Sequence, residues 1–222
     1  PISYPSLIDE EEVVDAICIG EGEHSFYELV QKISRGEDFY STKGFYFRTG
    51  GKVIKNELNQ LVEDLDSLPF PKRELYYEKY KLLEESPTKG FTISRGCPYL
   101  CTFCYAHSLR KQYIGSKFVR FYSYDYIIKH IKDVKKSYPL DAIKFFDSTF
   151  TVNYSYIKEF LPLYKKEIDI PYLINTRFDN LNEDIVRLLK ETGCDRITLG
   201  LESGNEKYRK EVLKKNFTND RV

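Results

Sequence analysis

Three cysteines within eight residues constrain this chain more than any other feature. Cys97, Cys101 and Cys104 form a C-x-x-x-C-x-x-C run directly after a strand-like segment, residues 91–94. Burying three neighbouring thiols as plain apolar groups gains little, whereas a metal centre gives each thiol a partner. Thiolates select soft centres, namely zinc, copper(I) and iron–sulfur clusters. The run therefore predicts a metal or cluster site.

The number of thiols narrows the choice of centre. A closed structural zinc site uses four protein ligands, whereas a catalytic site keeps one position open. The competing hypothesis is a zinc site completed by His107, which follows Cys104. Ordinary zinc sites pair two cysteines with a distant second pair of ligands, and no second pair follows in this sequence. The sequence therefore favours an iron–sulfur centre with three cysteine ligands over zinc.

The run resembles the signature of the radical SAM superfamily, C-x-x-x-C-x-aromatic-C, with Phe103 at the aromatic position and Tyr105 after the last cysteine. The resemblance implies a [4Fe–4S] cluster on Cys97, Cys101 and Cys104, with S-adenosylmethionine (SAM) on the fourth iron. It also implies reductive cleavage of SAM to methionine and a 5′-deoxyadenosyl radical, which abstracts hydrogen from an unreactive carbon. Such an enzyme needs a reducing electron donor of the flavodoxin or ferredoxin type.

Composition bounds the class of protein. With 222 residues, 41% of them hydrophobic and 31% charged, the chain can bury a core. Lys+Arg and Asp+Glu number 34 each, so no global positive field indicates nucleic acid or an anionic membrane as partner. The apolar runs are too short to span a bilayer. Because the chain starts at Pro1 and contains no methionine, we expect a fragment.

Two further cysteines lie outside the run. Cys18 and Cys194 each sit in an apolar strand-like segment and are predicted to be small buried core residues. An odd count of five cysteines, with three in one cluster, favours a reducing, cytoplasmic compartment.

The first 90 residues predict a small α/β segment and a linker. Residues 13–19 form a β-type run, and residues 25–33 have helical spacing of apolar side chains. Residues 44–48 and 52–54 flank Gly50-Gly51, a strong hairpin signal. The proline-containing stretch 64–71 predicts a linker. We therefore expect a division into residues 1–62, a linker over 63–90, and a second domain over 91–222.

This N-terminal part of the chain, within the first 90 residues, resembles the region that joins the two domains in the cobalamin-binding class of radical SAM proteins. The matching stretches are GEGEHSFYELV, the hairpin, and DLDSLPFP. The resemblance implies that a flavodoxin-like (Rossmann-like) cobalamin domain precedes the barrel and that only its end is present. The D-x-H-x-x-G motif of that class is absent from this sequence, and His24 is interpreted as a surface residue. Cobalamin is therefore a possible cofactor of the full-length protein.

From Phe91 onward, strands alternate with helices. Strands are predicted at 91–94, 140–147, 171–177 and 195–202, with helices at about 123–137, 154–167 and 182–192 and another opening near 204. Ser123 and Asn182 are good helix N-caps. The alternation predicts an α/β fold with a parallel sheet and right-handed crossovers. The resemblance implies a partial (βα)6 TIM-like barrel, of which about four units fit into this chain.

Candidate site residues follow the predicted strand ends, where chemistry collects in parallel barrels. They are Asp147, Asn175, Arg177 and Glu202. By resemblance, Glu202 contacts the ribose hydroxyls or the amino group of SAM, Arg177 contacts its carboxylate, and Phe103 packs near its adenine. Tyr105 joins this set of expected cofactor contacts, and no catalytic residue is assigned beyond the cluster.

Each site residue has a competing interpretation. Asp147 is equally suited to cap the next helix, and Arg177 to be a surface charge. Where many family members have D-D-x-F-T, this chain has Ser148 in place of the second acid. The Lys-rich stretches 132–136 and 207–215 are interpreted as solvated helix faces.

The sequence alone leaves three functions open. With cobalamin, the resemblance implies methyl transfer, or a rearrangement or cyclisation, on an unknown small-molecule substrate. Without it, the implied function is another radical SAM modification. An iron–sulfur electron carrier, or a zinc interaction module, would need a fourth ligand such as Cys18 or Cys194.

Overall fold

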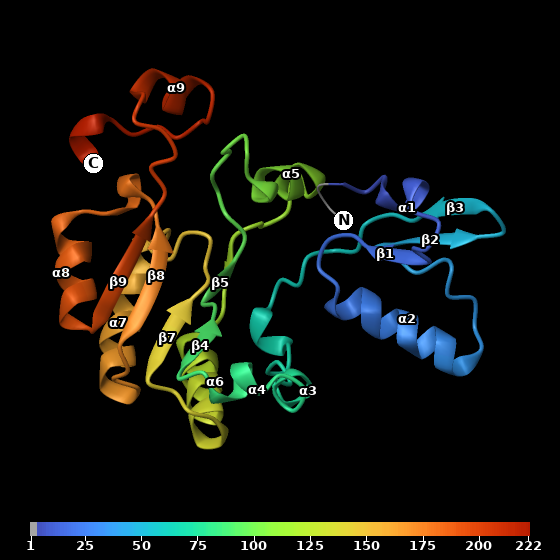
Figure 1. The fold of residues 1–222 in the computed structure, drawn as a ribbon, viewed down its shortest axis with the longest axis horizontal. Helices are drawn as coiled ribbons and strands as arrows, with labels where there is room; N and C mark the ends of the chain where they lie inside the picture. Colours follow the sequence, from blue (N-terminus) through green and yellow to red (C-terminus); the bar gives the residue numbers. More distant parts are fainter. Residues whose placement is uncertain (1–3) are drawn as a thin grey trace. The chain divides into compact units, whose positions relative to one another are not determined.

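Two parts of the chain pack separately in the computed structural model, which describes residues 4–222 (Figure 1). The first unit comprises the chain up to Glu63 together with Phe103–Phe118. The second comprises Asp64–Thr102 together with Val119–Val222. The second unit therefore carries most of the predicted βα series.

The first unit is built on a three-stranded antiparallel sheet of order β1-β2-β3. The strands are β1 (Ala16–Cys18), β2 (Phe45–Thr49) and β3 (Lys52–Lys55). The predicted hairpin is confirmed, because Gly50 and Gly51 both have positive φ values, 53° and 72°, as a two-residue hairpin turn requires. β1 pairs antiparallel with β2. That this unit ends a cobalamin-binding domain stays a prediction.

Helices cover both faces of this small sheet. Ile8 of α1 (Leu7–Glu10) packs with Ile17 and Ile19. In another cluster, Leu29 of α2 (Glu23–Arg35) packs with Phe45 and Phe47. The helix predicted at 25–33 is thus present. Most of its apolar side chains, namely Phe26, Val30 and Ile33, are nevertheless exposed.

The helix that follows the cysteine run also belongs to the first unit. It is α5 (Tyr105–Gln112), which was not predicted. After α5, Tyr113 and Phe118 pack with Leu61 in one buried apolar cluster. The Tyr113 hydroxyl lies so close to Gly20 that a Cβ at that position would overlap with it. Gly20 therefore permits this close packing.

The second unit is a four-stranded parallel sheet with helical crossovers, as predicted. Its order is β4-β7-β8-β9, and every neighbouring pair is parallel. The strands are β4 (Thr88–Phe91), β7 (Ala142–Phe145), β8 (Tyr172–Thr176) and β9 (Cys194–Leu199), and the crossover helices are α6 (Tyr124–Ser137), α7 (Tyr154–Glu167) and α8 (Glu183–Glu191).

Local sequence signals explain where these helices begin. The Ser123 hydroxyl accepts a hydrogen bond from the Tyr126 N–H at 3.1 Å, and the Asn182 side chain accepts one from the Ile185 N–H at 2.8 Å. Both predicted N-caps are confirmed, and each supplies a partner for an otherwise unpaired N–H of the first turn. Pro162 lies inside α7, which continues through it.

The sheet buries one face against the helices and leaves the other partly open. Ile143, Phe145, Tyr172 and Ile174 are fully buried, and the Phe145 ring contacts Phe160 and Tyr164 of α7. Figure 1 shows α6 and α7 behind the strands. The alternate residues, such as Lys144 and Asn175, are half-buried on the opposite face. A sheet covered by helices on one side matches a partial barrel.

The first predicted strand is displaced along the chain. The prediction placed it at 91–94, whereas β4 covers Thr88–Phe91 and only a two-residue strand, β5 (Ser94–Arg95), follows. β5 pairs with β6 (Arg120–Phe121). Thr-Lys-Gly lacks the apolar alternation of a strand, yet Lys89 is buried, with its ammonium donating to the Leu83 and Glu84 carbonyls. Those bonds make a charged strand residue possible.

Short elements complete the second unit. The predicted linker, residues 63–90, contains two short α-helices before β4 begins. The remaining elements are η1 (Leu65–Ser67), α3 (Glu74–Tyr77), α4 (Lys81–Glu85), η2 (Phe178–Asn180), α9 (Glu206–Glu211) and η3 (Asn219–Arg221). Along residues 4–222, no helix has the length and apolar character needed to cross a bilayer.

Candidate functional site

The cysteine run lies in the loop that leaves the carboxyl end of β4. Gly96, with φ of 87°, turns the chain after β5. Cys97 and Cys101 are buried, and Cys104 is half-buried where α5 begins. Among the described residues, none of the three forms a disulfide bond with another cysteine. Among the residues that the structure describes, no group of three or more His, Cys, Asp and Glu side chains is arranged to hold a metal ion, so the case for a cluster rests on the donor set.

Arg177 connects the end of β8 to the cysteine loop. Its Nε and one terminal nitrogen donate to the two carboxylate oxygens of Asp179, at 2.8 and 2.7 Å. Its other terminal nitrogen donates to the Cys101 sulfur at 3.1 Å. The guanidinium also lies 3.7 Å from the centroid of the Tyr99 ring. Arg177 is 6% exposed, so it is not a surface charge.

Hydroxyl groups connect the loops further. The Tyr99 hydroxyl donates to the Asn180 side chain. The Thr151 and Thr176 hydroxyls lie 2.5 Å apart, and Thr151 also donates to the Asn180 carbonyl at 3.1 Å. The loops after β4, β7 and β8 therefore form one hydrogen-bonded layer at the carboxyl edge of the sheet.

Asp147 ties β7 to the start of the cysteine loop. Its carboxylate accepts hydrogen bonds from the Ile93 N–H, at 3.1 and 3.2 Å, and from the Ser94 hydroxyl. Burial raises the pKa of Asp147 to about 6, although those hydrogen bonds oppose the rise. The helix-cap interpretation is wrong, because Asn153 caps α7 instead. The Thr149 hydroxyl of the same loop lies 4.0 Å from the Cys97 sulfur.

Asn175 lies on the open face of the sheet. Its side-chain oxygen accepts a hydrogen bond from the Lys144 ammonium at 2.9 Å. Lys144 was not predicted as a site residue, since a lysine inside a strand gives no motif. The bond fixes the oxygen of the Asn175 amide and leaves its NH2 group directed elsewhere.

Glu202 is held in an uncommon backbone conformation. Its φ is 66°, in the left-handed region that non-glycine residues seldom adopt, and such strain gathers at functional sites. Its carboxylate lies 3.2 Å from the Lys215 ammonium, which also donates to the Gly200 carbonyl at 2.6 Å.

Lys215 is buried, so its assignment to a solvated face is wrong. Lys132, Lys135 and Lys136 are exposed, as expected.

Phe103 and Tyr105 flank Cys104 in the first unit. Their side chains are 55% and 60% exposed. Both rings are therefore accessible for stacking, as a contact with an adenine requires. Their assignment to SAM stays a prediction.

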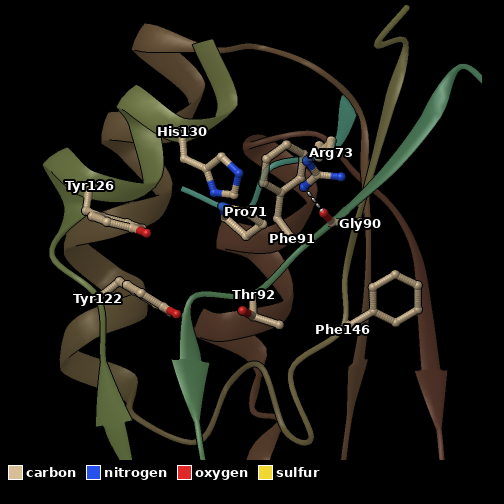
Figure 2. Close-up of a pocket in the computed structure, with 9 residues that line it drawn as sticks. All are labelled: Pro71, Arg73, Gly90, Phe91, Thr92, Tyr122, Tyr126, His130 and Phe146. Carbon is tan, nitrogen blue, oxygen red and sulfur yellow. Dashed lines mark hydrogen bonds between the residues drawn. The ribbon is translucent and has the colours of Figure 1, made fainter. Parts of the chain in front are cut away.

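A cavity of about 300 Å³ lies beside β4 in the second unit (Figure 2). His130 stacks on Phe70 at 4.7 Å and contacts the edge of Phe91 at 5.0 Å. Burial, assisted by the positive charge of Arg73, lowers the pKa of His130 to about 4. Arg73 donates to the Gly90 carbonyl at 2.6 Å. Both residues therefore pack the outer edge of the sheet and are not part of the cysteine site.

Comparisons with known proteins settle the family. The family model described as the radical SAM superfamily matches residues 91–222. The chain belongs to the radical SAM superfamily. Members of this superfamily are enzymes that use a [4Fe–4S] cluster and SAM.

Two curated relatives and one solved structure illustrate this membership. An uncharacterized methyltransferase from Pyrococcus horikoshii is 31% identical over 194 residues, covering 86% of this chain and 41% of that protein. Anaerobic magnesium-protoporphyrin IX monomethyl ester cyclase from Synechocystis is 24% identical over 214 residues, covering 95% and 42%. The cobalamin-dependent radical SAM enzyme OxsB, solved with aqua-cobalamin and SAM, has a TM-score of 0.78 at 23% identity, covering 100% and 32%.

The chain therefore spans less than half the length of these relatives. The solved neighbour supports the fold expected for the radical SAM core, a partial barrel whose strands are β4, β7, β8 and β9.

The donor set of this radical SAM chain fits a [4Fe–4S] cluster. Three cysteines in one loop, none of them in a disulfide, match the three cysteine ligands of the superfamily. Burial of Cys97 and Cys101 shields two of the sulfurs from water, and the Arg177 charge beside Cys101 suits an anionic thiolate. The match to the radical SAM superfamily, and not the arrangement of the side chains, favours this cluster over zinc completed by His107.

The two remaining cysteines are not part of the three-cysteine run. Cys18 and Cys194 are half-buried rather than fully buried as expected. Burial raises the pKa of both thiols, that of Cys194 to about 11. Cys194 lies at the first residue of β9, at the amino end of the sheet. It is therefore remote from the carboxyl edge that holds Cys101.

Proposed function

We propose that the chain is part of a cobalamin-dependent radical SAM enzyme that transfers a methyl group, or performs a rearrangement or cyclisation, on a small-molecule substrate. The names of the relatives support this proposal, since they include a methyltransferase, a cyclase and a cobalamin-dependent enzyme. The observation that carries it is the loop of three cysteines without disulfide bonds, in which Cys101 accepts a hydrogen bond from Arg177. The bound cluster would supply the electron for reductive cleavage of SAM.

The chain's own residues would bind and orient SAM at the carboxyl edge. Glu202, held by Lys215, would accept hydrogen bonds from the ribose hydroxyls or the amino group of SAM. Asn175, whose side-chain oxygen accepts from Lys144, would offer its NH2 group as a donor. Phe103 and Tyr105 would stack on the adenine. Each of these assignments is supported by position and accessibility.

Two other expected contacts would act less directly. Asp147 has three hydrogen bonds within the protein, so its main contribution would be to order the start of the cysteine loop. Arg177 has Asp179 and Cys101 as partners. A SAM carboxylate would have to replace one of them.

Anaerobic reconstitution with iron and sulfide tests the cluster and SAM parts of the proposal. The reduced protein should give an electron paramagnetic resonance (EPR) signal of a [4Fe–4S] cluster that changes when SAM is added. Stoichiometric zinc without a competent cluster would rule the proposal out.

Cobalamin dependence needs its own measurement. The full-length protein, purified with hydroxocobalamin, should show the visible absorption of bound cobalamin in about one equivalent. The second candidate is a cobalamin-independent radical SAM modification, which the superfamily match over residues 91–222 equally allows. A SAM-responsive cluster without bound cobalamin would select that candidate. An electron donor of the flavodoxin or ferredoxin type would serve either reaction.

A further inference from the structure

Arg177 divides its hydrogen bonds between one carboxylate and one cysteine sulfur. Asp179 takes two nitrogens in a bidentate pair, which is the most directional contact that a guanidinium makes. Tyr99 covers one face of the guanidinium plane at 3.7 Å. These two contacts leave the remaining terminal nitrogen directed at the Cys101 sulfur, 3.1 Å away.

The supports of Arg177 are themselves fixed. Tyr99 is held by its hydroxyl bond to Asn180, whose carbonyl accepts from Thr151. Asp179 is two residues from Arg177 within the short helix η2. The donor nitrogen is therefore pre-oriented toward Cys101, and it is buried with the sulfur away from competing water.

Such a bond has a defined effect on a cluster ligand. Hydrogen bonds to cysteine sulfur and reduced solvent exposure are among the factors that set the potentials of iron–sulfur clusters. A reduced cluster carries one more negative charge than the oxidised cluster. A cation beside the sulfur stabilises the reduced form more, because the attraction grows with the charge. The bond should therefore make the cluster easier to reduce.

We propose that Arg177 is a positioning residue that holds Cys101 by an N–H···S hydrogen bond and raises the reduction potential of the cluster, with Asp179 and Tyr99 fixing its orientation. The inference rests on the proposed [4Fe–4S] cluster. It assigns Arg177 a role that precedes SAM binding, unlike the carboxylate contact expected from the sequence.

The test is a redox titration of the reconstituted full-length protein, monitored by EPR in the absence of SAM. Arg177→Gln removes the positive charge. Arg177→Lys keeps the charge but loses the planar guanidinium, which donates to Asp179 and Cys101 at the same time. Arg187→Gln is the matched control, because Arg187 is exposed on α8. At equal iron content, we expect a lower midpoint potential in Arg177→Gln, a smaller decrease in Arg177→Lys, and no change in the control.

An unchanged midpoint potential in Arg177→Gln would overturn the inference. Weaker SAM binding in the same variant would then assign Arg177 to the SAM carboxylate. If Arg177→Gln fails to retain four irons, the Arg177→Lys protein is used instead, and an unchanged midpoint potential in that variant would also overturn the inference. A wild-type protein that forms no SAM-responsive cluster would instead reject the proposed function, and the inference with it.

Discussion

Glu202 and Gly200 show how closely the end of β9 is packed around one carboxylate. A Cβ on Gly200 would overlap with the Glu202 carboxylate and lie 2.9 Å from the Lys215 ammonium. We predict that Gly200→Ala displaces the Glu202 carboxylate and weakens SAM binding roughly tenfold, the effect of losing one charge-assisted hydrogen bond. Isothermal titration of SAM into the reconstituted protein measures this change.

Gly204→Ala is the control for that substitution. A Cβ on Gly204 would meet no atom within 4 Å, and the φ of Gly204 is not in the left-handed region. The Gly204→Ala protein should bind SAM like the wild type. Equal SAM affinity in the two variants would remove Glu202 from the proposed site.

The raised pKa of Asp147 predicts how the free energy of unfolding depends on pH. Its folded pKa of about 6 lies above the ordinary value of 3.8 because the carboxyl is buried. The folded protein thus binds this proton more tightly than the unfolded chain, so the free energy of unfolding should fall as pH rises from about 4 to about 6. The contribution is at most on the order of 3 kcal/mol.

Asp147→Asn should remove that contribution, because its amide does not titrate. Thermal unfolding between pH 4 and 6.5 should then show a smaller decrease in melting temperature than in the wild type. Asp141→Asn, at an exposed position, should keep the wild-type dependence. An Asp147→Asn curve parallel to that of the wild type would contradict the raised pKa.

At the scale of elements, β4 depends on a buried lysine. The Lys89 ammonium donates to the Leu83 and Glu84 carbonyls at 2.7 Å each, at the end of α4. Lys89→Met keeps the apolar stem but removes both donors. We predict a loss of about 1–3 kcal/mol in the free energy of unfolding, measured by urea denaturation. Lys135→Met, on the exposed face of α6, should leave the free energy of unfolding unchanged, and equal losses would contradict this account.

Elements with local signals were predicted well from the sequence. Capping side chains mark α6 and α8, the residues of α7 were predicted without its cap Asn153, and the Gly50-Gly51 turn marks the β2–β3 hairpin. β4 was displaced because its buried lysine has partners that only the folded chain supplies. α5 was missed, since its sequence, YAHSLRKQ, has no capping residue before it.

The site was predictable only in outline. Strand ends located Asp147, Arg177 and Glu202 on one edge of the sheet, because parallel strands place their carboxyl ends together. Their partners were not predictable. Arg177 and Cys101 are 76 residues apart, and Lys215 reaches Glu202 from beyond α9. Sequence spacing carries no signal for such contacts.

At the scale of the whole molecule, the position of Cys194 separates a radical SAM site from an electron carrier. Cys194 pairs with Tyr172 at one end of β8, and Leu199 pairs with Thr176 at the other. Four residue steps of about 3.3 Å along β8 place these ends roughly 13 Å apart. Cys194 is therefore too far from Cys101 to share a cluster. Cys194→Ala should retain the full iron and sulfide content of the wild type, and loss of the cluster would favour a four-cysteine carrier.

The central claim is that three cysteines hold a cluster with one iron open to SAM. The most direct test is the EPR spectrum of the anaerobically reconstituted, reduced protein before and after addition of SAM. We predict a [4Fe–4S] signal whose g values shift when SAM is added, because SAM becomes a ligand of the open iron. A [4Fe–4S] signal that SAM leaves unchanged would contradict the claim.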